Sequence, residues 1–236
     1  MFSAEIIQFL RNHFPVHLSE VRAAVDLLVY SVDDAIEAII KKGNALSTNK
    51  ELQEAIIFLE KAGEMEIALK TLQNYMNQIE TEDDSPIFED EILDNIEKQN
   101  PNYDEYSTDR TTAYTLFENY TYKRPHAFEM INQTVNVRDW KDMLMETCKK
   151  LTKINKDLIL RFPDDPKFNG KKISYFSDKP ETMRSPRRIE TLDLFVETNF
   201  SANHIRNLII KMLNHYGIPL SEYKIYLRAD YSPLHK

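Results

Sequence analysis

The chain has few glycines and a single cysteine, and both scarcities exclude kinds of functional site. Its four glycines, Gly43, Gly63, Gly170 and Gly217, are scattered along 236 residues. A glycine-rich loop that cradles phosphates is therefore absent. Cys148 has no second cysteine with which to pair, so an internal disulfide is excluded. Its place within a helical pattern favours a buried apolar side chain over a catalytic nucleophile.

Long apolar runs are also missing, although 42% of the residues are apolar, enough for an ordinary core. No stretch of 18 apolar residues occurs. The apolar pattern of the first fourteen residues is interrupted by Glu5, Arg11 and His13. These features predict neither a membrane span nor a signal peptide, and we expect a cytoplasmic protein with no membrane partner.

The histidines show almost no spacing typical of a metal site. The pair His13 and His17 is separated by three residues, but Pro15 lies between them and would break a helix that aligned them. We therefore expect no zinc, no other metal and no cofactor.

The net charge of −8 is distributed unevenly along the chain. Residues 1–80 carry 7 basic and 12 acidic side chains, residues 81–110 carry 2 and 11, and residues 111–236 carry 21 and 15. Opposite charge in the two parts of a chain can indicate a nucleic-acid-facing domain with an acidic counterpart, although solvated faces without a partner are at least as common.

Residues 1–80 predict a small all-α bundle of four or five short helices. Helix starts are indicated at Ser19 and at Asp33, and Gly43 is expected to end the helix that begins at Asp33. Two further helices are expected at 51–63 and 64–79. A helix-turn-helix is disfavoured because the acidic side chains of these helices would repel phosphate. Docking of a protein partner or a homodimer is the preferred interpretation.

Residues 81–110 form an acidic segment with no periodicity, which predicts a linker. It contains an apolar island, Ile87-Phe88 followed by Ile92, Leu93 and Ile96. This island is either an interaction element or a short helix that packs on a neighbouring domain.

Residues 111–236 alternate between strand and helix patterns, in the order β-β-α-β-β-α-β. The best-specified stretch is 191–217, a strand with Leu192, Leu194 and Val196 on one face followed by a helix that Asn199 or Ser201 can cap. A hairpin is expected around Asn132-Gln133. The expected fold class is α+β overall: the N-terminal bundle plus a C-terminal α+β domain with a mostly antiparallel sheet and two main helices on one face.

The strongest local signal is basic, with net charge +5 between residues 167 and 188. Arginines and lysines interleaved with an aromatic residue suit phosphate contacts and stacking on an unpaired base. Contact with an acidic protein surface, or with the acidic linker, explains the composition equally well. The candidate nucleic-acid-binding residues are Lys167, Lys171, Lys172, Tyr175, Lys179, Arg184, Arg187 and Arg188.

Carboxylates suited to a metal-dependent nuclease are weakly indicated. Pro163-Asp164 and Asp165-Pro166-Lys167 contain the residue types of such sites but crowd them into one loop. Glu197, at the end of its strand beside Asn199, is better placed, although helix capping is the commoner role for such a pair. No catalytic residue is therefore assigned.

Several short motifs of the C-terminal region carry a resemblance to a known group of proteins. They are Lys123-Arg124-Pro125-His126-Ala127-Phe128, Val137-Arg138-Asp139-Trp140, Tyr175-Phe176-Ser177, Met183-Arg184-Ser185-Pro186 and Phe195-Val196-Glu197-Thr198-Asn199. Residues 111–230 resemble an uncharacterised C-terminal module of bacterial proteins, some of them similar to restriction or anti-phage components. The resemblance implies a bacterial accessory or recognition module and brings no catalytic residues.

The sequence thus leads to a ranked set of functions. The first is a non-enzymatic bacterial accessory protein that recognises nucleic acid, most simply DNA, within an anti-phage system. The alternative is a protein-only adaptor subunit of a larger complex. A metal-dependent nuclease that uses Glu197 comes last.

Overall fold

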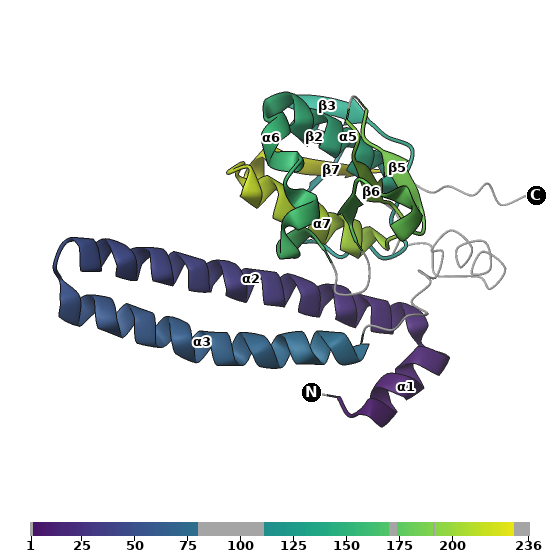
Figure 1. The fold of residues 1–236 in the computed structure, drawn as a ribbon. Helices are drawn as coiled ribbons and strands as arrows, with labels where there is room; N and C mark the ends of the chain where they lie inside the picture. Colours follow the sequence, from purple (N-terminus) through teal and green to yellow (C-terminus); the bar gives the residue numbers. More distant parts are fainter. Residues whose placement is uncertain (1, 80–110, 170–173, 191, 229–236) are drawn as a thin grey trace, which may run out of the picture. The chain divides into compact units, whose positions relative to one another are not determined.

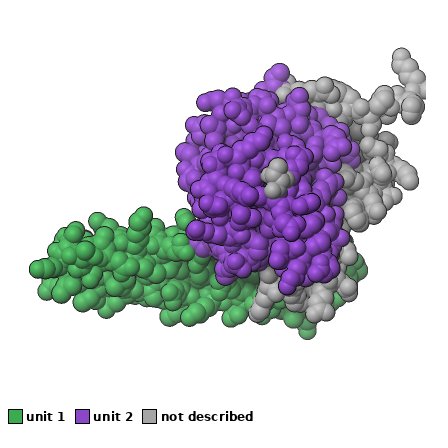
Figure 2. Space-filling view, turned by 45° about the horizontal axis from the view of Figure 1, so that its top comes forward, with its two compact units in different colours: residues 1–84 green, residues 85–236 purple. Residues whose placement is uncertain are grey.

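The computed structural model describes residues 2–79, 111–169, 174–190 and 192–228. The chain divides into two compact units, unit 1 (Met1–Asp84) and unit 2 (Ser85–Lys236), which Figure 2 colours separately. Unit 1 is helical, and unit 2 combines antiparallel sheets with helices, so the expected α+β class is confirmed (Figure 1). The expected acidic linker lies outside the described residues.

Residues 2–79 of unit 1 form three helices, α1 (Ala4–His13), α2 (Pro15–Thr48) and α3 (Leu52–Ile79). The side chain of Ser3 caps α1 by accepting a hydrogen bond from the backbone N–H of Ile6. α2 and α3 run antiparallel as a long hairpin (Figure 1). The prediction of four or five short helices was wrong, because the expected ends at Gly43 and Gly63 lie inside α2 and α3.

The close packing of α2 against α3 explains why the helices continue through Gly43. A Cβ atom at Gly43 would lie 3.1 Å from side-chain atoms of Leu59, so the glycine lets the two helices approach closely at this level. Ile36 of α2 and Ala62 and Leu69 of α3 form a buried cluster between the helices. Tertiary packing therefore overrides the low helix propensity of glycine.

The larger sheet of unit 2 has the strand order β1-β7-β2-β3, with every neighbouring pair antiparallel. Its strands are β1 (Ala113–Tyr114), β2 (Pro125–Met130), β3 (Gln133–Asn136) and β7 (Tyr223–Leu227). Phe128 stacks on Tyr223 in the core, with ring centroids 5.1 Å apart. The expected hairpin is confirmed, one residue earlier than predicted: Ile131 and Asn132 form its two-residue turn.

Two main helices follow, as predicted: α5 (Trp140–Ile154) and α7 (Ala202–His215). Asp139 caps α5 and Ser201 caps α7, each through its side-chain oxygen. α5 packs on the larger sheet, where the hydroxyl groups of Thr147 and Tyr223 lie 2.8 Å apart. A short helix, α6 (Lys156–Ile159), comes directly after α5.

A second sheet has the order β4-β6-β5, which corrects the expectation of a single sheet. It consists of β4 (Phe176–Ser177), β5 (Pro186–Arg188) and β6 (Phe195–Glu197), all antiparallel. β5 is not evident from the sequence, since two arginines and a proline give no strand pattern. Pairing with the buried β6 makes it a strand.

The segment between β1 and β2 is a set of turns tied to α7. The guanidinium of buried Arg206 donates to the carbonyl oxygens of Leu116 and Glu118, at 3.2 and 2.9 Å. Asn203 accepts a hydrogen bond from the backbone N–H of Tyr120 at 2.9 Å. Burial lowers the pKa of Arg206. These polar side chains therefore serve as anchors inside the fold.

Candidate functional site

The described basic candidates of the sequence lie on the second sheet and the segments around it. Lys179, Arg184, Arg187 and Arg188 are exposed, and Lys167 is half-buried in a short 3-10 helix (Pro166–Phe168). Arg187 and Arg188 lie on β5, opposite Val196 and Phe195 of β6. Lys171 and Lys172 lie outside the described residues. Residues 179–188, the basic segment, thus consist of an edge strand and the chain that leads into it, rather than a free loop.

Glu197 fixes the backbone of this basic segment. Its carboxylate is buried and accepts hydrogen bonds from the backbone N–H groups of Arg184 at 2.6 Å, Ser185 at 3.0 and 3.1 Å, and Asn199 at 2.7 Å. Both oxygens are occupied by donors of the same chain. A carboxylate held in this way anchors a turn and is not open to a metal or a substrate.

The prediction that Tyr175 stacks on a nucleic-acid base is corrected by the structure. Its side chain is buried, and its ring packs edge-to-face on Phe200 and His204, at 5.0 and 5.1 Å between centroids. The alternation of Tyr175 with basic residues in the sequence does not show whether its ring is buried or exposed. Tyr175 belongs to the core, and the described basic segment lacks an exposed aromatic ring of this kind.

Two arginines of the segment already interact with carboxylates of the same chain. Arg188 lies 3.5 Å from Asp193 and donates from Nε to the carbonyl oxygen of Leu192 at 3.0 Å. The side chains of Arg188 and Asp193 are 63% and 88% exposed, so the ion pair contributes about 0–1 kcal/mol and can exchange for a phosphate. The charge of Arg187 helps to lower the pKa of Asp142 on α5.

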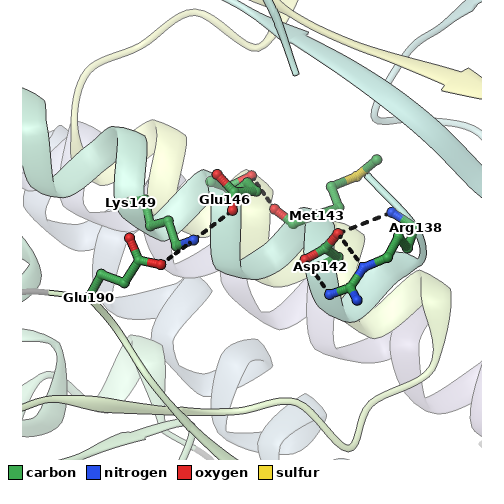
Figure 3. Close-up of polar contacts among 7 residues, drawn as sticks. Arg138, Asp142, Met143, Glu146, Lys149 and Glu190 are labelled. Carbon is green, nitrogen blue, oxygen red and sulfur yellow. Dashed lines mark hydrogen bonds and ion pairs between the residues drawn. The ribbon is translucent and has the colours of Figure 1, made fainter. Parts of the chain in front are cut away.

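The surface of α5 beside β5 carries two groups of paired charges (Figure 3). Near its start, the guanidinium of Arg138 donates to Asp142 at 3.2 Å. Two turns further on, Lys149 lies 2.7 Å from Glu146 and 2.8 Å from Glu190, which follows β5. Hydrogen bonds to both glutamates raise the pKa of Lys149. This ion-pair group links α5 to the end of the basic segment.

A groove of about 640 Å³ opens between the β2–β3 hairpin and the last turns of α5. Its cationic side is formed by Lys150 and Lys153, and its apolar side includes Met130, Ile131 and Ile154. Glu146, Lys149 and Glu190 close the end nearest β5. The sequence did not predict this groove, because residues 140–154 show only the pattern of a core helix. An isoleucine beside Asn132 in a hairpin turn is the signal that could have indicated an exposed apolar side chain there.

The remaining sequence candidates are used in local structure. The side chain of Asp165 accepts a hydrogen bond from the backbone N–H of Lys167 and so caps a 3-10 helix. His215 lies 4.0 Å from this carboxylate. Across the described ranges, no group of three or more histidine, cysteine, aspartate or glutamate residues is placed to hold a metal ion.

Comparisons with known proteins find no matching family model, no similar curated protein and no similar solved structure. Within the described part of the chain, no helix combines the length and the apolar character needed to cross a bilayer.

Proposed function

We propose that the chain is a non-enzymatic accessory protein whose second unit contacts the phosphate backbone of nucleic acid, most simply DNA. The contacts are made by Lys179, Arg184, Arg187 and Arg188. Guanidinium groups are suited to bidentate contacts with phosphate, and contact with phosphates alone requires no exposed aromatic side chain.

The observation that carries this proposal is the anchoring of the basic segment by Glu197. Three backbone N–H groups are held at its carboxylate, and the residues that follow pair with β6. The arginine side chains project from a fixed backbone, so less conformational entropy is lost when they bind an anion. A basic segment without such an anchor would lose more conformational entropy on binding.

A measurement of DNA binding by fluorescence anisotropy tests the proposal. The double variant Arg184→Glu/Arg187→Glu is compared with Lys156→Glu/Arg161→Glu, which reverses two exposed charges of the same unit outside the basic segment. We expect the first variant to bind more weakly at about 50 mM salt, and the magnitude of its log K against log[salt] slope to fall by about 1.8 on duplex DNA, since two phosphate contacts are lost. Equal losses in the two variants, or no binding by the wild-type protein, would refute it.

A second function, the docking of a protein partner or a second copy, is favoured by the exposed apolar side chains of unit 1. Ten large apolar residues there are at least 40% exposed. They are Phe2, Ile6, Phe9, Phe14, Leu28, Leu52, Ile56, Ile57, Leu59 and Ile67. Exposed apolar surface on this scale is typical of interfaces. Sedimentation of the wild-type protein and of Ile56→Asp/Ile67→Asp over a range of concentrations tests this role. A wild-type protein that stays monomeric at every concentration would argue against a second copy as the partner.

The place of this activity in a bacterial anti-phage system rests on the resemblance of residues 111–230 alone. What copurifies with the protein from its own cell provides the test. DNA removed by the Arg184→Glu/Arg187→Glu change supports the first function. A stoichiometric protein that remains after nuclease treatment supports the protein-only adaptor.

A further inference from the structure

The groove between the β2–β3 hairpin and the end of α5 is a second surface of unit 2, separate from the basic segment. Its volume of about 640 Å³ lies in the range of pockets that hold a drug-sized ligand or a few side chains of a peptide. Neither the anchoring of the basic segment nor the contacts of the arginines on β5 involves Ile131, Lys150, Lys153 or Ile154. The groove therefore requires its own explanation.

The lining of the groove carries more positive than negative charge, since Lys149, Lys150 and Lys153 accompany Glu146 and Glu190. Lys150 donates to the side-chain oxygen of Gln133 at 2.8 Å, and neither it nor Lys153 forms an ion pair with a carboxylate in the described part of the chain. Burial lowers the pKa of Lys150, and the nearby positive charge of Lys153 lowers it further. The negative charge of Glu146 opposes both effects but is weaker. Two like charges are thus held together at the groove, where a ligand carboxylate would be stabilised.

The apolar side of the groove contains an isoleucine in an unfavourable conformation. Ile131 has φ 51° and Asn132 has φ 57°, so both turn residues are left-handed. Glycine or asparagine is the usual choice there, and a β-branched residue is a genuine outlier. The side chain of Ile131 is nevertheless 44% exposed, and that of Ile154 across the groove is 51% exposed. The turn thus holds an apolar side chain at the groove despite the conformational cost of a left-handed β-branched residue.

We propose that this groove binds an acidic peptide segment of a partner protein, with an aliphatic or aromatic side chain against Ile131 and Ile154 and a carboxylate at Lys150 and Lys153. The charge pattern favours peptide over nucleic acid. Glu146 and Glu190 share a single lysine, Lys149, so together they keep a net negative charge that would repel a continuous phosphate backbone, whereas a peptide can place its carboxylates at Lys150 and Lys153. The apolar side chains suit an aliphatic anchor better than a sugar-phosphate chain.

The experiment begins with selection from a random peptide library displayed on phage against the full-length protein. We expect the enriched peptides to combine aspartate or glutamate with leucine, isoleucine or phenylalanine. A synthetic copy of one enriched peptide is then titrated by fluorescence anisotropy. An enriched set that is basic, or no enrichment at all, would overturn the proposal.

Matched variants locate the binding. Lys153→Glu should weaken peptide binding about tenfold, because one attraction becomes a repulsion, whereas Lys156→Glu, an equally exposed lysine outside the groove, should change it less than about twofold. Ile131→Gly suits the left-handed turn and removes the side chain, so it should keep the wild-type melting temperature and still weaken binding about tenfold.

Two further measurements distinguish the groove from other binding sites and peptide from nucleic acid. Peptide binding that Lys153→Glu and Ile131→Gly leave unchanged would place the peptide elsewhere and refute the groove as its site. Single-stranded DNA that binds and is lost specifically in Lys153→Glu would make the groove a nucleic-acid surface, which also contradicts the proposal. The Arg184→Glu/Arg187→Glu variant should retain full peptide binding, so failure of the DNA proposal leaves this one standing.

Discussion

Replacement of Glu197 by glutamine tests whether this carboxylate anchors the basic segment. The change keeps the shape of the side chain and turns one oxygen into an NH2 group. Each carboxylate oxygen accepts at least two of the backbone N–H contacts from Arg184, Ser185 and Asn199. In either orientation of the amide, a backbone donor therefore faces another donor and loses its acceptor.

The expected cost follows from these bonds. One unsatisfied buried N–H costs about 1–3 kcal/mol, and loss of the charge weakens the remaining bonds by about 1 kcal/mol each. Part of this loss is offset, because burying a neutral amide costs less desolvation energy than burying a charged carboxylate. We expect unit 2 to lose about 2–4 kcal/mol, a large share of the ~5–15 kcal/mol typical of a domain.

Urea unfolding followed by tryptophan fluorescence measures this loss. Trp140 is the sole tryptophan of the chain and is buried in unit 2, so its emission reports that unit without a contribution from the helical hairpin. The control is Glu190→Gln, which makes the same atomic change at a side chain that is 71% exposed. It should shift stability by less than about 0.5 kcal/mol.

Two results would refute the anchoring argument. If Glu197→Gln matches the control, the hydrogen bonds contribute nothing measurable. If the variant is more stable than wild type, Glu197 behaves like a strained functional carboxylate, and a magnesium-dependent nuclease would return to consideration. Loss of DNA binding by a folded Glu197→Gln protein would instead agree with the proposed function.

Further predictions concern single residues of both units. Burial raises the pKa of Cys148 to about 12, so the native thiol should resist alkylation at pH 8 and react only on unfolding, as counted by mass spectrometry. Burial acts to raise the pKa of Asp142, but hydrogen bonds from Arg138 outweigh this effect and lower the pKa. The stability that the Asp142 carboxylate adds, at most about 1 kcal/mol, should therefore be present above pH 4 and be lost as the pH falls through the folded pKa. In acid, the free energies of unfolding of wild type and Asp142→Asn should converge. Gly217→Ala should destabilise unit 2 by about 1–2 kcal/mol in urea titrations, because φ is +65° there. Gly63 lies within α3 with open space around it, so Gly63→Ala should stabilise unit 1 by about 0.5–1 kcal/mol. Circular dichroism should show this as a higher melting temperature.

Local periodicity was a sufficient guide where one face of an element is buried. The cap at Ser201 and the strand Tyr223–Leu227 follow from residue spacing, and the structure confirms them. The burial of Leu192, Leu194 and Val196 is also confirmed, although the strand that ends at Glu197 begins only at Phe195. The failures arise where partners distant in sequence decide the outcome. β5 is a strand only because it pairs with β6, and α2 continues through Gly43 because Leu59 packs there.

The candidate site shows the same limit. Charge density pointed correctly to exposed arginines at 184, 187 and 188, because repulsion and hydration keep such residues at the surface. It could not show that Tyr175 is buried or that Arg188 faces Asp193. The groove depends on the meeting of a hairpin tip with a helix end, two features that lie about twenty positions apart and share no motif.

The strand order of the larger sheet has a consequence for the way unit 2 is made. β7, which is near the end of the chain, is inserted between β1 and β2 and supplies pairing to both. On the ribosome, β1 and β2 end 109 and 93 residues before the start of the strand that joins them, and the hydrogen-bonding edge of β2 stays open in the meantime. Contacts so remote in sequence slow the folding step itself, so unit 2 is expected to fold late and to be most vulnerable to aggregation during synthesis.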